Sequence, residues 1–143
     1  MERTASAVWN GALRDGNGSI STQSGTISNL PYSFATRFEN GKGTNPEELI
    51  AAAHAGCYSM ALSAQLATMN FTPQTIRTAA TVSLEKLEAG WTISKIHLDV
   101  KAMIPGISAA AFESAANSAK ANCPVSRLLK AEITMTANLE RAA

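Results

Sequence analysis

The apolar residues of this chain gather in one long stretch that carries no charge. Residues 50–76 include no Asp, Glu, Lys or Arg. Just before them, Asn45 is a preferred helix cap, Pro46 suits the first helical position, and Glu48 stands where a capping-box acid belongs. We predict a helix from this start to about Asn70. A helix that is apolar on nearly every side must be buried by other elements.

Alternating apolar and polar residues predict strands after this helix. Residues 76–84 and 96–104 alternate on either side of a tight turn at Ala89-Gly90, and residues 131–139 alternate again. Between these strands, Ser108 caps an alanine-rich helix that extends to about Asn122, and a short helix follows over residues 125–130. Strands with one polar face are typical of antiparallel sheets.

The N-terminal part reads as short strands separated by glycine turns. Asp15-Gly16, Asn17-Gly18 and Ser24-Gly25 are turn-type dipeptides. In residues 32–38 the aromatic residues alternate, which predicts a strand with Arg37 on the face opposite them. The resulting prediction is an α+β fold built as a single domain over residues 1–143.

Composition narrows the classes of function. Charged residues make up 16% of the chain and hydrophobic residues 45%, which favours an oligomer with a large buried interface. The net charge is +1 and no basic block occurs, which argues against nucleic-acid binding. Alanine dominates the uncharged stretch, which favours a buried helix over a membrane span. The N-terminus lacks the apolar core of a signal peptide, so we expect a reducing cytoplasm and no permanent disulfide.

The residues that could carry chemistry are two cysteines, two histidines, one arginine and one glutamate. Cys57 and Cys123 are 66 positions apart, and neither has a second ligand at zinc-finger spacing, so we expect no metal site. A Cys57–His54 hydrolase fits poorly, because no third group is evident to orient the histidine. His97 falls on the polar face of a strand.

Thiol redox chemistry fits these residues better. Cys57 lies in mid-helix, so a cation rather than the helix N-terminus must favour its thiolate. In a buried setting that cation is better supplied by arginine than by lysine, and a buried arginine needs a carboxylate. Arg37 and Glu47, close to each other across a glycine-rich link, could supply the pair.

Spacing adds a constraint. Glu47 precedes Cys57 by ten positions, which is about 15 Å along a straight helix. Either Arg37 spans that gap, or Glu47 meets the Cys57 of a second subunit. We favour the second hypothesis, because two-fold pairing of such helices would also explain the scarcity of charge. Taken singly, each residue also has an ordinary structural explanation: a buried cysteine packs as a small hydrophobe, and an acid suits the first helical turn.

The combination of motifs is more specific than its parts. The segments Thr44-Asn45-Pro46-Glu47-Glu48-Leu49-Ile50, Ala53-His54-Ala55-Gly56-Cys57 and Asn122-Cys123-Pro124-Val125-Ser126 closely resemble the OsmC/Ohr family of thiol peroxidases. Pro31-Tyr32-Ser33-Phe34, Thr36-Arg37-Phe38-Glu39 and Pro105-Gly106-Ile107 favour its OsmC (osmotically inducible protein C) branch. The resemblance covers essentially the whole chain.

The resemblance implies an intertwined homodimer whose long central helices are wrapped by antiparallel sheets. It makes Cys57 the peroxidatic cysteine and Cys123 the resolving one, with Arg37 and Glu47 as the activating ion pair. Arg14 is a rival for the role of Arg37, because the Ohr branch takes this arginine from nearer the N-terminus.

The implied reaction is the reduction of organic hydroperoxides to alcohols, in oxidative or osmotic stress defence. It proceeds through a Cys57 sulfenic acid and a Cys57–Cys123 disulfide, without a bound cofactor. An external dithiol would reduce the disulfide, and the family suggests lipoyl groups. We expect an apolar pocket around Cys57, lined by neighbours such as Met60 and Leu62 and by residues of the partner subunit. The alternative is a non-enzymatic redox-sensing or small-molecule-binding stress protein.

Overall fold

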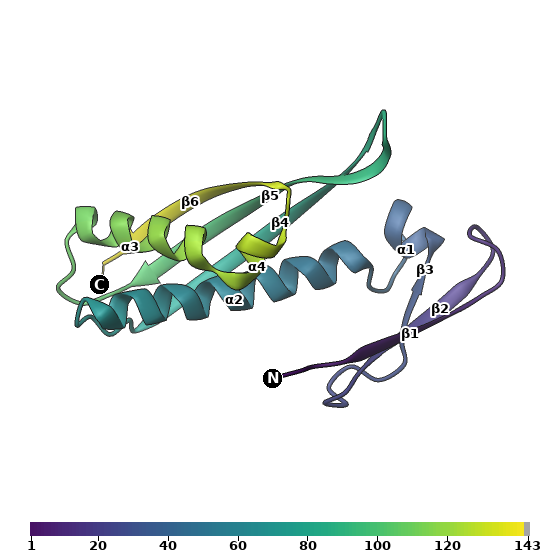
Figure 1. The fold of residues 1–143 in the computed structure, drawn as a ribbon, viewed down its shortest axis with the longest axis horizontal. Coiled ribbons are helices and arrows are strands. Elements are labelled where there is room, and N and C mark those ends of the chain that lie inside the picture. The colour runs from purple at the N-terminus through teal and green to yellow at the C-terminus, as the bar shows by residue number, and fades with distance from the viewer. Residues whose placement is uncertain (142–143) are drawn as a thin grey trace. The chain divides into compact units, whose positions relative to one another are not determined.

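The computed structural model describes residues 1–141. The chain divides into two compact units, Met1–Leu49 and a second unit that begins at Ile50. Helix α2 (Pro46–Thr68) begins in the first unit and continues through the second (Figure 1). The single domain over residues 1–143 stays a prediction.

The first unit is a small antiparallel sheet followed by a short helix. Strands β1 (Ala5–Asn10), β2 (Asn17–Thr22) and β3 (Leu30–Ser33) pair in that order. The prediction of a turn at Asn17-Gly18 is wrong, because these residues begin β2. Gly18 is needed there because a Cβ atom at this position would lie 2.5 Å from the Tyr32 ring and 2.4 Å from the Val8 carbonyl oxygen.

The predicted strand over residues 32–38 is wrong beyond Ser33, where helix α1 (Phe34–Phe38) begins. A capping box starts the helix: the Ser33 hydroxyl accepts a hydrogen bond from the Thr36 backbone N–H, and the Thr36 hydroxyl accepts one from the Ser33 N–H. The rings of Phe34 and Phe38 lie 4.8 Å apart, one helical turn from each other. Arg37 therefore stands on a helix.

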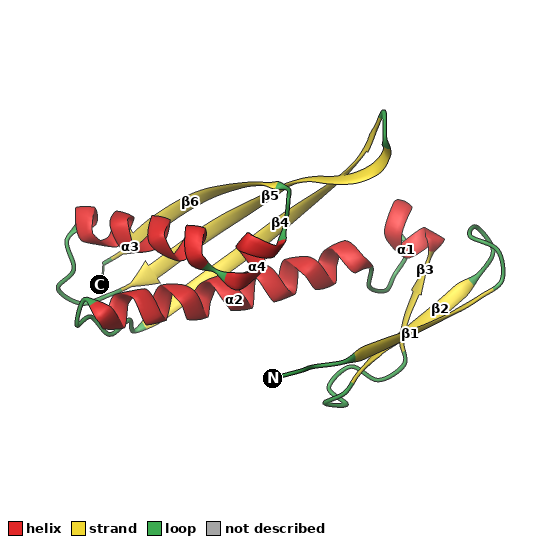
Figure 2. Cartoon of the chain, viewed as in Figure 1, coloured by secondary structure: helices red, strands yellow, loops and turns green. Residues whose placement is uncertain are grey.

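The second unit is a three-stranded sheet with helices on one face. Strands β4 (Thr75–Leu87) and β5 (Gly90–Met103) form the predicted antiparallel hairpin. Helices α3 (Ala109–Asn122) and α4 (Pro124–Leu128) then lead to β6 (Glu132–Glu140), and the strand order is β4-β5-β6 (Figure 2). Together the units confirm the α+β class.

The prediction of antiparallel sheets is wrong for β6, which runs parallel to β5. The reason is the connection. A parallel neighbour requires a crossover, and the two helices α3 and α4 provide it by returning the chain to a point beside Lys95, from which β6 runs in the direction of β5.

The core of the second unit lies between the helices and the β5 face of the sheet. The inward positions of 96–104 are all buried, as their alternation predicts. The core is formed by residues of α2, β5, the loop after β5, and α3: Tyr58, Leu62, Leu66, Ile96, Leu98, Val100, Ala102, Ile104, Phe112, Ala115, Ala116 and Ala119.

Helix α2 is buried on one side only. His54, Tyr58, Leu62 and Leu66 recur at intervals of four and are fully buried. The opposite side is exposed and, apart from Ser63, apolar. It is formed by Ala52, Ala53, Gly56, Met60, Ala64 and Ala67, and we call it the outer face of α2. No helix within residues 1–141 is long and apolar enough to cross a membrane.

Candidate active site

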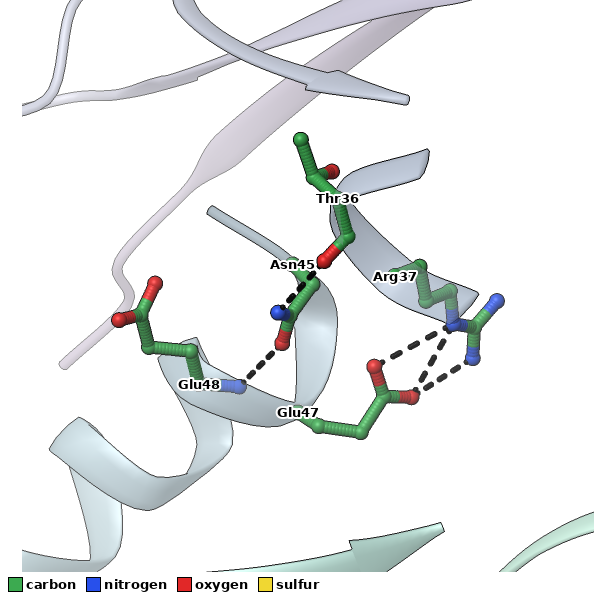
Figure 3. Close-up of polar contacts among 5 residues, drawn as sticks. All are labelled: Thr36, Arg37, Asn45, Glu47 and Glu48. Carbon is green, nitrogen blue, oxygen red and sulfur yellow. Dashed lines mark hydrogen bonds and ion pairs between the residues drawn. The ribbon is translucent and has the colours of Figure 1, made fainter. Parts of the chain in front are cut away.

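Arg37 and Glu47 form a bidentate ion pair in the first unit (Figure 3). Arg37 Nη2 lies 2.8 Å from Glu47 Oε1, and Arg37 Nε donates to Oε1 and Oε2 at 3.2 and 3.3 Å. Glu47 is only 8% exposed, whereas about a third of the Arg37 side chain is accessible. The fork geometry fixes the plane of the guanidinium and leaves one of its terminal nitrogens outside the pair.

Asn45 holds the two helices that carry this ion pair. Its side-chain oxygen accepts from the Glu48 backbone N–H at 2.8 Å, which caps α2, while its amide nitrogen donates to the Thr36 carbonyl of α1 at 3.0 Å (Figure 3). The Glu48 carboxylate accepts from the Thr44 hydroxyl at 2.7 Å, instead of closing a capping box onto Asn45. One asparagine therefore sets the start of α2 and the position of Arg37 above Glu47.

Arg14, the rival arginine, lies elsewhere in the same unit. Its guanidinium carbon is 5.5 Å from the centre of the Phe34 ring. The guanidinium carbon of Arg37 lies 5.2 Å from the centre of the Phe38 ring. It is thus Arg37 that the structure brings to Glu47.

An aromatic pocket of about 240 Å³ lies beside Arg37. Its apolar lining comes from β1, the loop after it, β3, α1 and the start of α2, and consists of Trp9, Leu13, Tyr32, Phe34, Phe38 and Pro46. Leu62 is fully buried in the core, so it does not line a pocket as predicted, whereas Met60 is 76% exposed on the outer face of α2. The pocket that Met60 would form with the partner subunit stays a prediction.

The two cysteines meet in the second unit. Cys57 Sγ and Cys123 Sγ lie 3.1 Å apart, and both are free thiols. Cys123 ends α3, where its N–H donates to the Ala119 carbonyl at 2.8 Å, and it also begins α4 ahead of Pro124. A disulfide bond is about 2.05 Å long, so closing one requires an approach of about 1 Å.

The surroundings of the two thiols differ. Burial raises the pKa of Cys57, and its hydrogen bond with Cys123 raises that pKa further. Burial by itself would also raise the pKa of Cys123. The nearby polar groups of Ser126, Cys57 and Val125 together outweigh burial, and the pKa of Cys123 is lowered. Within the described part of the second unit, no positively charged group is among the causes that shift the pKa of Cys57.

His54 contacts Ser126 rather than Cys57. His54 Nε2 and Ser126 Oγ lie 2.8 Å apart, and burial lowers the pKa of the imidazole, which keeps it neutral. His54 Nδ1 is buried and has no hydrogen-bond partner within residues 1–141. The Cys57–His54 pair that a hydrolase would need is therefore absent from the hydrogen bonds of this site. Within the same residues, no group of three or more His, Cys, Asp or Glu side chains could hold a metal ion.

Comparison with known proteins places this arrangement in a family. The family described as "OsmC-like protein" matches residues 39–138, a span that begins just after Arg37 and includes Glu47 and both cysteines. The chain belongs to the OsmC-like protein family. An OsmC-like relative, "Peroxiredoxin OsmC" of Escherichia coli (strain K12), is 51% identical over 140 residues, which are 98% of each chain.

More distant relatives agree with this assignment. An "Organic hydroperoxide resistance protein" of Xanthomonas axonopodis pv. citri is 28% identical over 100 residues, which cover 69% of this OsmC-like chain and 68% of the relative. The solved structure of the organic hydroperoxide resistance protein OhrB of Bacillus subtilis matches with a TM-score of 0.67, at 23% identity, over 96% of this chain and 98% of OhrB. An OsmC-like protein of Vibrio cholerae matches with a TM-score of 0.75 at 17% identity, over 96% of this chain and 99% of that one. The two structures show that the fold is shared.

The structure thus brings the four predicted site residues of this OsmC-like chain together as two pairs, Arg37 with Glu47 and Cys57 with Cys123. The sequence interpretation assigned no role to Ser126, although it lies three residues after Cys123 in a quoted motif. Its hydrogen-bond partner is His54, which lies 72 positions earlier, so no local spacing indicated the contact.

Proposed function

We propose that this chain is a cysteine-based peroxidase that reduces organic hydroperoxides to alcohols in stress defence. The observation that carries the proposal is the pair of free thiols, with Cys57 Sγ and Cys123 Sγ 3.1 Å apart. The named relatives support a peroxide-reducing stress protein. A structural role alone would not require two free sulfurs within bonding approach of each other.

The proposed reaction uses both sulfurs. The Cys57 thiolate attacks the terminal peroxide oxygen, the O–O bond breaks, and an alcohol leaves after taking up a proton. Cys57 becomes a sulfenic acid, and Cys123 condenses with it to a disulfide with release of water. A dithiol then reduces the disulfide to the two starting thiols, and we propose lipoyl groups as that dithiol.

Arg37 is proposed to make the Cys57 thiolate available. Because burial and Cys123 both raise the pKa of Cys57, a positive charge is required for a thiolate at neutral pH. Arg37 fits this role because Glu47 holds its guanidinium in one plane while part of the side chain stays accessible. The same cation would stabilise the charge that develops on the peroxide oxygens. The aromatic pocket beside Arg37 suits the organic part of a hydroperoxide.

The proposed assembly is a homodimer in which the outer face of α2 packs against a second copy. This face is apolar and exposed, and a Cβ atom added at Gly56 would meet nothing within 4 Å, so a second helix could approach closely. The low proportion of charged residues, 16%, points the same way.

A single charge on this face is expected to dissociate the dimer. Ala64→Glu would bury an unpaired carboxylate at the proposed contact, which is strongly unfavourable. Sedimentation should show wild-type protein at the mass of a dimer and the variant at the mass of a monomer. Ala121→Glu, at an exposed alanine of α3, is the matched control and should remain dimeric. A dimeric Ala64→Glu protein would contradict this interface.

Turnover of cumene hydroperoxide with dihydrolipoamide tests the proposed function. We expect continuous consumption of many equivalents of peroxide per chain, because the dithiol regenerates both cysteines. Glutathione, a monothiol, should support slower turnover. Oxidation that stops after one equivalent with every reductant would instead favour the redox-sensing alternative.

A further inference from the structure

We propose that Arg14 binds a carboxylate on the organic part of the hydroperoxide, so that the site selects anionic organic hydroperoxides over neutral ones. This inference rests on the proposed peroxidase function and names a substrate class within it. Its basis is a guanidinium that lies beside the aromatic pocket. The guanidinium carbon is 5.5 Å from the centre of the Phe34 ring, and both Phe34 and Leu13, the neighbour of Arg14, line the pocket.

The loop between β1 and β2, which carries Arg14, has a defined shape. The Gly16 N–H donates to the Ala12 carbonyl at 2.8 Å across the turn. A Cβ atom at Gly16 would lie 2.3 Å from the Ala12 carbonyl oxygen, so only glycine fits there. The indole N–H of Trp9, which lines the pocket, donates to the Gly11 carbonyl at 3.0 Å. Arg14 therefore stands in a constrained turn that is tied to the wall of the pocket.

The charge of Arg14 has no protein partner among the residues that the structure describes. Within residues 1–141, Arg14 and its neighbour Asp15 take part in no ion pair. The described residues that line the pocket include no Asp or Glu. An anionic group on a ligand would therefore meet an uncompensated positive charge beside the pocket, and no carboxylate of the lining would oppose it.

The contact with Phe34 leaves the hydrogen-bond donors of Arg14 available. A guanidinium placed over a ring makes a cation–π contact, which uses none of its five N–H donors. Those donors form the planar fork that matches a carboxylate. Arg37 is unsuited to this role, because Glu47 already binds its fork at 2.8 to 3.3 Å and would repel a second carboxylate.

Two phenyl rings connect the two arginines. The centres of the Phe34 and Phe38 rings lie 4.8 Å apart, and the guanidinium carbon of Arg37 lies 5.2 Å from the centre of the Phe38 ring. One cation thus lies over each ring, and the rings supply apolar surface between them. A ligand with a peroxide at one end, an apolar chain and a carboxylate at the other end matches this order. Its peroxide would lie at Arg37 and its carboxylate at Arg14.

The expected effect is modest because Arg14 is exposed. Water and salt screen a pair of charges at the surface, so such a pair changes affinity by at most about 5-fold. A ratio of two substrates is therefore a sharper readout than a single rate. Raising the ionic strength should lower this ratio, because salt screens only the ligand that is charged.

The test compares octanoic acid that carries a hydroperoxide on its terminal carbon with the methyl ester of the same compound. With dihydrolipoamide as reductant, wild-type protein should show a kcat/KM about 5-fold higher for the acid, and the difference should lie in KM. Arg14→Met, which keeps an apolar side chain, should lower the ratio to about one, and Arg14→Lys should retain part of it. Arg3→Met removes another exposed arginine of the same unit and should keep the wild-type ratio.

The possible failures are distinguishable. An equal ratio of acid to ester in wild type and Arg14→Met would overturn the inference. Cumene hydroperoxide has no carboxylate, so both proteins should reduce it equally well. Loss of that activity in Arg14→Met, with a shifted pH profile of Cys57, would also overturn the inference, because Arg14 would then be the activating cation. If wild-type protein reduces none of the three peroxides, the proposed function fails and this inference fails with it.

Discussion

Cys57→Ser is expected to lower turnover of organic hydroperoxide by at least about 10³-fold, because removing a nucleophile removes the step on which the reaction depends. A serine hydroxyl is not ionised at neutral pH and cannot store the oxidation as a sulfenic acid. The coupled assay with cumene hydroperoxide and dihydrolipoamide measures this loss. Far-ultraviolet circular dichroism should be unchanged, since the substitution exchanges sulfur for oxygen.

Cys123→Ser provides the matched comparison. This variant keeps the Cys57 thiol, so one equivalent of peroxide should still be consumed and a sulfenic acid trapped by dimedone. Continuous turnover should fall, because the disulfide that the dithiol reduces can no longer form. Full turnover in Cys123→Ser would contradict a resolving role, and full turnover in Cys57→Ser would contradict the mechanism as a whole.

The long helix could be predicted because its signals are local. Asn45 caps it at the predicted position, and Asn70, with φ of 60°, lies just beyond its last residue. The buried face of β5 could also be predicted, from the alternation of apolar and polar residues over 96–104. In both cases the structure of the segment is determined by residues that are close to one another in the sequence.

Helix α1 was missed because its sequence fits two periods. Phe34 and Phe38 are four apart, which suits alternation in a strand as well as contact on a helix. The distinction depends on Ser33 and Thr36, whose reciprocal capping uses threonine in place of the usual acid or amide. The parallel partner of β6 was missed for a different reason, since strand pairing depends on the path of the crossover.

The site was predicted as a set of residues, but its geometry depends on tertiary contacts. Cys57 and Cys123 are 66 positions apart, and no spacing rule places their sulfurs at 3.1 Å. The contact between Ser126 and His54, which are 72 positions apart, could not be predicted for the same reason. The Arg37–Glu47 pair could be predicted because only a short glycine-rich link separates the two residues.

Arg37→Met should lower peroxide reduction at neutral pH by about 10²-fold, the usual cost of losing one electrostatic stabiliser. Without the cation, burial leaves the pKa of Cys57 raised, and the thiolate fraction is small below that pKa. Activity should therefore recover as the pH is raised toward it, whereas wild-type protein should reach its plateau at lower pH. The rate of Cys57 oxidation across a pH series measures both effects. Arg14→Met, which removes the guanidinium over Phe34, should keep the wild-type profile.

Mixed dimers then show which chain supplies the arginine. If Arg37 acts on the Cys57 of the other subunit, a dimer of one Arg37→Met chain and one Cys57→Ser chain has one complete site and one doubly altered site. Random exchange makes half the dimers mixed, so the mixture should recover about a quarter of wild-type activity. If Arg37 acts within its own chain, no dimer has a complete site and nothing is recovered. Loss of activity in Arg14→Met with full activity in Arg37→Met would reassign the cation, because only the arginine that stabilises the thiolate can shift the pH profile of Cys57.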